Sequence, residues 1–61
     1  MNIYRLLVWD EENMNLDPKW YFTFSTPETL EVETQEAVRS SVEIAAEIAY
    51  NRPMMAEILE D

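Results

Sequence analysis

Carboxylates are the most abundant reactive side chains in this 61-residue sequence, which holds thirteen Asp and Glu residues against four Lys and Arg residues. It has no His, no Cys and no Gly, and its formal net charge is −9 at pH 7. Without His and Cys, the usual nucleophile–base pairs and soft metal sites cannot be built. Ser25, Ser40 and Ser41 therefore lack a histidine to activate them, and Lys19 is the sole lysine.

One group of acids has the ligand type that a hard cation prefers. Asp10, Glu11, Glu12 and Asp17 would offer carboxylate oxygens to an ion such as Ca²⁺. Their spacing does not match the EF-hand loop, and the chain has no Gly for the sharp turn of that loop. We therefore expect solvated charges around a hairpin tip, and no metal or cofactor.

Paired carboxylates also act as acid and base in glycoside hydrolysis. Such catalysis needs a water-excluding cleft of about 300 Å³ or more, which would hollow out so small a core. We therefore expect that the chain is not an enzyme. A very small metal-dependent enzyme that uses the loop carboxylates is the minor alternative.

The composition predicts one folded domain over residues 1–61, because 48% of the residues are hydrophobic and seven are aromatic. A chain of this length buries only about 60% of its unfolded surface, so a lone core is marginal. With no Cys for disulfides, self-association or a well-packed core must stabilise it. The sequence has no run of about 18 apolar residues and no secretory signal pattern, which predicts a cytoplasmic protein without a membrane span.

Two strands are expected in the first half of the chain. Residues 2–9 are rich in strand formers and apolar on both faces, which leaves open which face meets the core. Residues 20–25 alternate, with Trp20, Phe22 and Phe24 on one face. The polar residues 10–18 between them predict an antiparallel hairpin with a long tip, where Asn13, Asn15 and Asp17 tolerate turn conformations.

The second half predicts a short strand followed by helices. Residues 29–33 alternate and favour a third strand, although a helix with Thr26 as its cap and Pro27 at its first position is the alternative. Thr34 is then expected to cap a helix over 35–50, which ends at 51–53 because of Pro53. Residues 54–59 favour a second short helix, with a kinked continuation of the first as the alternative.

The predicted fold is therefore α+β: an antiparallel sheet of two or three strands packed on one long helix, with a short C-terminal helix (β-β-(β)-α-α). The expected core comprises apolar residues from each element: Leu6, Val8, Trp20, Phe22, Phe24, Leu30, Val32, Val38, Val42, Ala45 and Ile48.

The predicted long helix carries an acidic stripe. Glu36, Glu43 and Glu47 fall within about 40° of one another at helical spacing, and Glu31 and Glu33 precede them. An ordinary solvated face, with ion pairs to Arg39 worth only about a few tenths of a kcal/mol each, is one interpretation. The other is a partner-binding surface that docks on a basic groove and imitates nucleic-acid phosphates.

The same helix has an apolar arc of about 200°, whereas packing on one sheet requires little more than 100°. Another surface must cover the excess, and a second copy of the chain across a two-fold axis would do so. The candidate residues for self-association are small or adaptable: Ala45, Ala46, Ala49, Met54 and Met55. Trp9, Tyr21 and Met54 are candidate anchors for a different partner, because binding hot spots favour buried large side chains.

These features favour a small acidic protein-binding module that occupies a basic, nucleic-acid-binding surface of a larger protein as an inhibitor or modulator. It is similar in size and charge to small viral inhibitors of host enzymes, which is an analogy and not evidence of common descent. The alternative is a self-associating structural or assembly subunit, whose Ala-rich helix face forms a homodimer. The net charge argues against direct binding to nucleic acid or to an anionic membrane, and the aromatics of 20–24 lack the positive groove that single-stranded nucleic acid requires.

Overall fold

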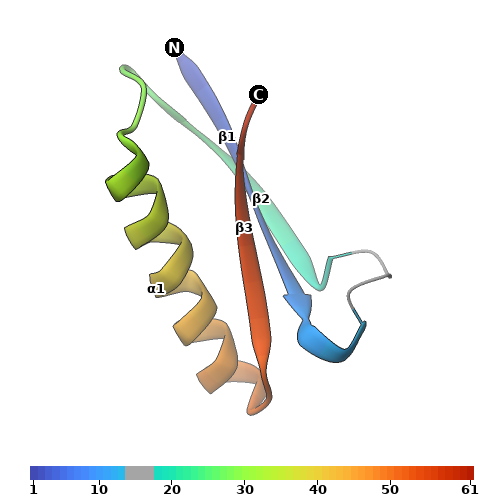
Figure 1. Ribbon diagram of the computed structural model, residues 1–61. Helices are drawn as coiled ribbons and strands as arrows, with labels where there is room; N and C mark the ends of the chain where they lie inside the picture. The colour runs from blue at the N-terminus through green and yellow to red at the C-terminus, as the bar shows by residue number, and fades with distance from the viewer. Residues whose placement is uncertain (14–17) are drawn as a thin grey trace.

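The computed structural model describes residues 1–13 and 18–61, which form a three-stranded antiparallel sheet with one helix against it (Figure 1). The elements follow in chain order: strand β1 (Asn2–Asp10), a 3₁₀ turn (Glu11–Asn13), strand β2 (Trp20–Thr26), helix α1 (Val32–Tyr50) and strand β3 (Met54–Glu60). The strands are arranged β2-β1-β3, so that the first strand along the chain is the central one. The α+β class and the antiparallel sheet predicted from the sequence are confirmed.

The central position of β1 gives both of its edges a partner strand. Leu6 lies opposite Phe22 of β2 on one side and opposite Ile58 of β3 on the other. Tyr4, Leu6 and Val8 point to the side that carries α1 and are completely buried. The face of β1 that meets the core, which the sequence left open, is therefore the one with Tyr4, Leu6 and Val8.

The predicted hairpin is confirmed, since β1 and β2 pair in antiparallel fashion from Asn2 opposite Thr26 to Val8 opposite Trp20. The connection begins with the 3₁₀ turn, in which the Glu12 N–H donates to Asp10 Oδ1 at 3.0 Å. The turn preferences expected for Asn15 and Asp17 concern positions outside the described residues.

The expected strand at 29–33 is wrong, and so is the expected cap at Thr34. The first helical hydrogen bond runs from the Gln35 N–H to the Glu31 carbonyl at 2.9 Å, so α1 begins at Val32 and Thr34 lies inside its first turn. Glu31 occupies the cap position with an extended backbone and no side-chain capping bond. The alternation of five residues was too short to distinguish a strand from a helix start.

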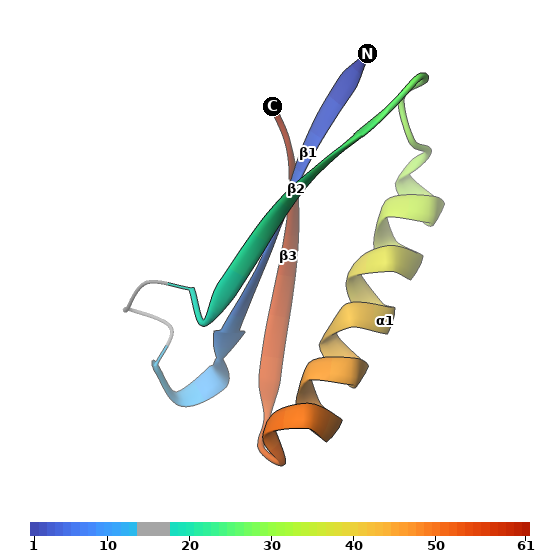
Figure 2. The same ribbon diagram turned by 180° about the vertical axis from the view of Figure 1, so that it is seen from behind.

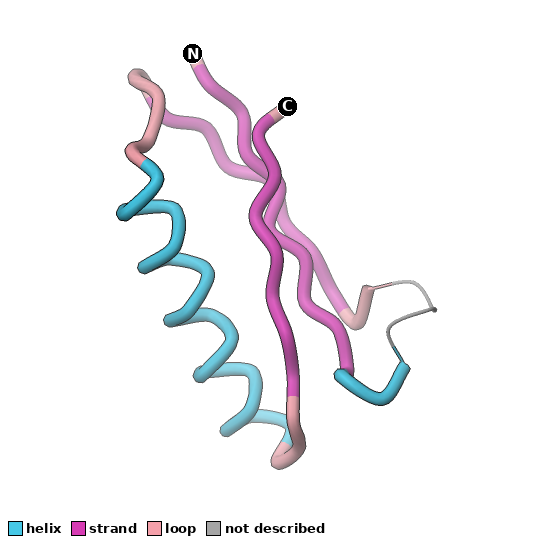
Figure 3. The backbone as a smooth tube through the Cα atoms, in the orientation of Figure 1, coloured by secondary structure: helices cyan, strands magenta, loops and turns pink. Residues whose placement is uncertain are grey.

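The end of the helix is as predicted, because α1 stops at Tyr50 ahead of Pro53. Asn51 takes the left-handed conformation, with φ 54° and ψ 45°, and this reverses the chain. The expected C-terminal helix is wrong, since Met54–Glu60 forms β3 and pairs with β1 (Figure 3). Met54 and Ala56 alternate toward the helix side, and pairing with the second edge of β1 outweighs the helical spacing of Met54, Met55, Ile58 and Leu59.

The core lies between α1 and the strands β3 and β1, on which the helix packs. Its buried cluster is formed by Val8, Ala46, Met54 and Ala56, with Trp20 and Val42 packed against it. Viewed from behind, α1 runs beside β3 and leaves the middle of β2 without a helix over it (Figure 2).

This position of the helix corrects part of the expected core. Leu6 and Val8 are buried as predicted, whereas Phe22 is 41% exposed, Val32 80% and Ile48 77%. The remaining expected members are Trp20, Phe24, Leu30, Val38 and Val42, which are half-buried, and Ala45, which is exposed. One helix over two of three strands cannot cover all the apolar positions that the sequence offers.

Candidate functional site

The acidic flank of α1, formed by Glu33, Glu36, Glu43 and Glu47, is the first candidate surface. At helical spacing these four side chains fall within about 80° of one another. Glu43 is half-buried and the other three are exposed, as is Glu31, which lies directly before the helix. Glu33, which the sequence places on the acidic face but in a strand, lies in the first turn of α1, on the same side of the helix as the stripe.

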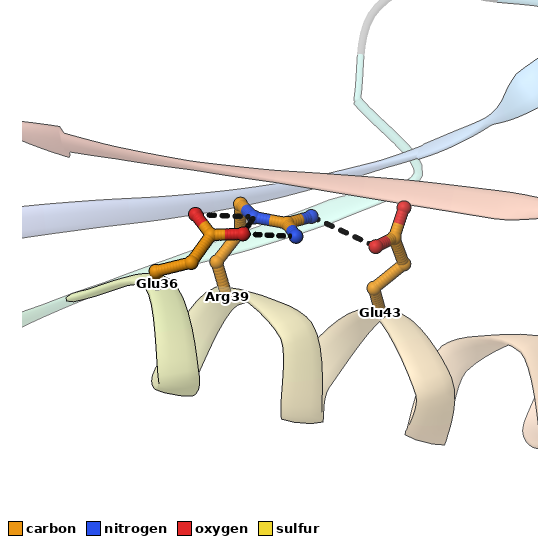
Figure 4. A network of polar contacts seen from close by, with 3 residues as sticks. All are labelled: Glu36, Arg39 and Glu43. Carbon is orange, nitrogen blue, oxygen red and sulfur yellow. Dashed lines mark hydrogen bonds and ion pairs between the residues drawn. The ribbon is translucent and has the colours of Figure 1, made fainter. Parts of the chain in front are cut away.

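Arg39 lies at the centre of an ion-pair network on this flank (Figure 4). Its Nη1 donates to Glu43 Oε2 at 2.8 Å, and its Nε donates to Glu36 Oε1 at 3.0 Å. The hydrogen bonds from Arg39 lower the pKa of the Glu36 carboxyl, and the two glutamates raise the pKa of the Arg39 guanidinium. Arg39 thus neutralises part of the flank and fixes the positions of two of its carboxylates.

The other three basic side chains, all in the described part of the chain, also make intramolecular contacts. Arg5 Nη2 lies 2.9 Å from Asp61 Oδ1, and Arg52 Nη2 lies 2.7 Å from Glu12 Oε2. The Lys19 ammonium lies 5.6 Å from the centre of the Tyr50 ring. The positive charges are therefore held within the molecule, and the excess of carboxylates sets the potential that a partner meets.

Of the loop acids that the sequence predicts to be solvated charges, Glu11 and Glu12 are exposed, whereas Asp10 is not. Asp10 is buried, and its Oδ2 pairs with Arg52 Nε at 2.8 Å while its Oδ1 accepts from the Glu12 N–H. Asp17 lies outside the described residues. Across 1–13 and 18–61, no group of three or more Asp and Glu side chains is arranged to hold a metal ion.

A second candidate surface, the apolar groove, lies between β2 and α1. It has a volume of about 320 Å³, and its lining residues are Trp20, Val42, Ala45, Ala46, Ala49 and Tyr50. Trp20 stacks on Phe22 with ring centres 5.5 Å apart, which continues the apolar surface along β2. The three alanines singled out from the sequence therefore meet here, together with Trp20 of β2 and Tyr50 at the end of α1.

The remaining sequence candidates lie elsewhere. Met54 is buried in the core and presents no surface to a partner. Trp9 and Met55 lie opposite each other on the sheet face away from α1, where they line a separate groove of about 290 Å³. Tyr21 is on that same face and 63% exposed. The structure thus separates these anchors from the acidic flank.

Sequence reasoning missed the exposed apolar residues beside the groove. Ile44 is 54% exposed, and Phe22, Ile48 and Tyr50 also keep large exposed fractions. The signal that could have identified Ile44 and Ile48 was the width of the apolar arc, which was too great for one sheet. The sequence alone could not show which part of that arc the sheet would leave uncovered.

No helix within the described residues is both long and apolar enough to cross a bilayer. Comparison of the chain with protein-family models, with curated proteins and with solved structures gave no match. Its function is therefore argued from the acidic flank and the apolar groove.

Proposed function

We propose that this chain is a small acidic protein-binding module, which occupies a basic surface of a larger cytoplasmic protein and thereby inhibits or modulates it. The observation that carries the proposal is the acidic flank on a helix of 19 residues, in a molecule whose basic side chains are engaged internally. A basic partner surface would meet several carboxylates held in a fixed arrangement.

The length of the flank supports a partner that normally binds nucleic acid. From Glu33 to Glu47 the helix rises by about 21 Å, at 1.5 Å per residue. One strand of duplex DNA carries about six phosphates over that distance. With Arg39 among them, the four carboxylates carry a net charge of −3 over this length, about half the charge of one strand, in a form that a groove lined with Lys and Arg accepts.

The proposed mechanism is steric and electrostatic competition. The module covers the basic surface and so excludes the anionic ligand of the partner. Its association should be fast at low salt, and it should slow as the screening length shortens to about 8 Å at physiological ionic strength.

The test compares two double variants of equal charge. Glu33→Gln with Glu47→Gln removes two charges from the acidic flank and leaves the Arg39 network intact, whereas Glu11→Gln with Glu57→Gln removes two charges from other elements. Binding to a lysine-rich peptide is measured by fluorescence anisotropy at several salt concentrations. The flank variant should weaken binding about 3- to 10-fold and the control variant clearly less.

Two results would contradict the proposal. Equal weakening by both variants would show that the charge of the whole body attracts the peptide and that the flank is not a defined surface. An affinity that does not respond to salt would show that charge does not drive the binding at all.

The second candidate function is that of a self-associating structural or assembly subunit. The apolar groove favours it, because the groove and the exposed side chains around it form an apolar surface on a highly charged chain. In that case the negative charge serves solubility, and the apolar side of α1 carries the function.

A further inference from the structure

The sheet is wider than its single helix can cover. Strands lie about 4.8 Å apart, whereas a helix with its side chains is about 10 Å wide, so one helix covers two strands. In this molecule α1 packs on β3 and β1. The helix-side face of β2, with Trp20, Phe22 and Phe24, is left without a helix, and Phe22 is 41% exposed as a result.

The side of α1 that faces β2 has the form of a helix-packing surface. Ala45 and Ala49 line the apolar groove and form a row of small residues at i and i+4. Ile44 and Ile48 form the neighbouring row and are 54% and 77% exposed. A ridge of large side chains beside a row of small ones is the arrangement that lets two helices interlock.

Charge favours a second copy of this chain as the occupant. The lining of the groove contains no charged side chain among the described residues, and β2 has none in its sequence. Around the helix, Glu36, Glu43 and Glu47 lie at least about 120° away from Ala45 and Ala49 and at least about 100° away from Ile48, whereas Ile44 lies about 60° from Glu47 at the edge of the apolar surface. Two copies can therefore meet at the groove without bringing the carboxylates of their acidic flanks together, although each chain has a net charge of −9.

The exposed apolar area around the groove is also about what a second copy of the chain would cover. Phe22, Ile44, Ile48 and Tyr50 leave together about 400 Å² exposed, if each fully exposed side chain presents about 200 Å². A standard interface buries about 800 Å² on each partner, of which somewhat more than half is apolar. The residues around the groove thus supply roughly the apolar area that one half of a dimer interface requires.

We infer that the apolar groove is the interface of a two-fold symmetric homodimer, in which α1 of each copy lies over β2 of the other. Ile48 of one copy inserts between Trp20 and Ala49 of its partner, and the same contact repeats across the axis. The inference rests on self-association, the second candidate function, and it names the surface and the occupant.

The experiment measures mass in solution by light scattering over a range of protein concentrations. The wild-type chain should have twice its monomer mass of 7.2 kDa. Ile48→Glu should weaken the dimer at least about 30-fold, because it places a carboxylate in the apolar interface. Val32→Glu is the matched control, since Val32 is 80% exposed, lies outside the groove and receives the same charge.

Folding of each variant is checked by circular dichroism. If Ile48→Glu fails to fold, Ile48→Ala keeps a good helix former at this position, and it should still weaken the dimer about tenfold. A dimer that survives both Ile48 substitutions would overturn the interface while leaving self-association intact. A wild-type chain that stays monomeric at every concentration would overturn both, and the groove would then belong to a different partner.

Discussion

The Tyr4 hydroxyl donates a hydrogen bond to Glu60 Oε2 at 3.0 Å, and it accepts one from the Leu30 N–H at 2.8 Å. Three segments meet at this one buried oxygen: the central strand β1, the edge strand β3, and the loop that precedes α1. The Tyr4 ring also stacks on Phe24 of β2, with ring centres 5.4 Å apart. Tyr4 therefore links every strand of the sheet to the start of the helix.

Tyr4→Phe should lower the free energy of unfolding by about 1–3 kcal/mol, because the Leu30 N–H loses its acceptor and Glu60 loses its donor while the ring stays in place. Chemical denaturation measures the change. Tyr21→Phe is the control, since Tyr21 is exposed and its loss of a hydroxyl should cost almost nothing. Equal effects of the two substitutions would show that the buried hydroxyl contributes no stability.

Met54→Ala should destabilise the fold by about 2–5 kcal/mol, because Met54 is 2% exposed and its truncation leaves a cavity between α1 and the sheet. Met55→Ala should cost less, since Met55 lies half-buried on the opposite face. Thermal or chemical unfolding distinguishes the two. The reverse order would mean that the register of β3 is shifted by one residue.

Asn51→Ala should destabilise the chain by about 1 kcal/mol, because Asn51 has a positive φ that Asn tolerates through its short polar side chain and that Ala adopts only at a cost. Asn51→Gly should keep or improve stability, since Gly takes that conformation freely. Both variants are compared with the wild type by thermal unfolding. If Asn51→Gly destabilised the chain and Asn51→Ala did not, this would contradict the left-handed conformation of Asn51 at the end of α1.

The ion pair of Glu36 with Arg39 should make stability depend on pH in the acid range. Because its pKa is lowered from the ordinary value of 4.5, Glu36 stays ionised in the folded chain at a pH where the unfolded chain already binds the proton. The stabilisation is therefore complete above that ordinary value, and it is lost as the pH falls through the lowered one. Unfolding curves of the wild type and Glu36→Gln should differ by a constant amount near neutrality and converge in acid. A difference that persists unchanged in strong acid would exclude the ion pair as its source.

Alternation and helical spacing sufficed to predict the hairpin and most of α1, because Trp20, Phe22 and Phe24 alternate strictly and the helix has a long apolar arc. They failed at 29–33 and 54–59, which are too short for their periodicity to distinguish strand from helix. Only pairing with the second edge of β1 makes Met54–Glu60 a strand, and that contact joins positions far apart in the sequence.

The candidate surfaces were predictable to different degrees. The stripe of Glu36, Glu43 and Glu47 follows from helical spacing, which depends on local sequence alone. The groove does not, because it depends on which strands α1 covers. The sequence predicts Trp20 as a core residue and Ala49 as a residue for self-association, and it does not indicate that both line one groove.

The central place of β1 has a consequence for the rate of folding. The β1–β2 hairpin and the α1–β3 pair each join neighbouring parts of the chain, whereas the contact between Tyr4 and Glu60 closes a separation of 56 residues. Contacts across such separations cost more loop-closure entropy and slow the folding of small domains. We expect the docking of β3 on β1 to be the late step, and until then the free edge of the central strand can pair with strands of other molecules.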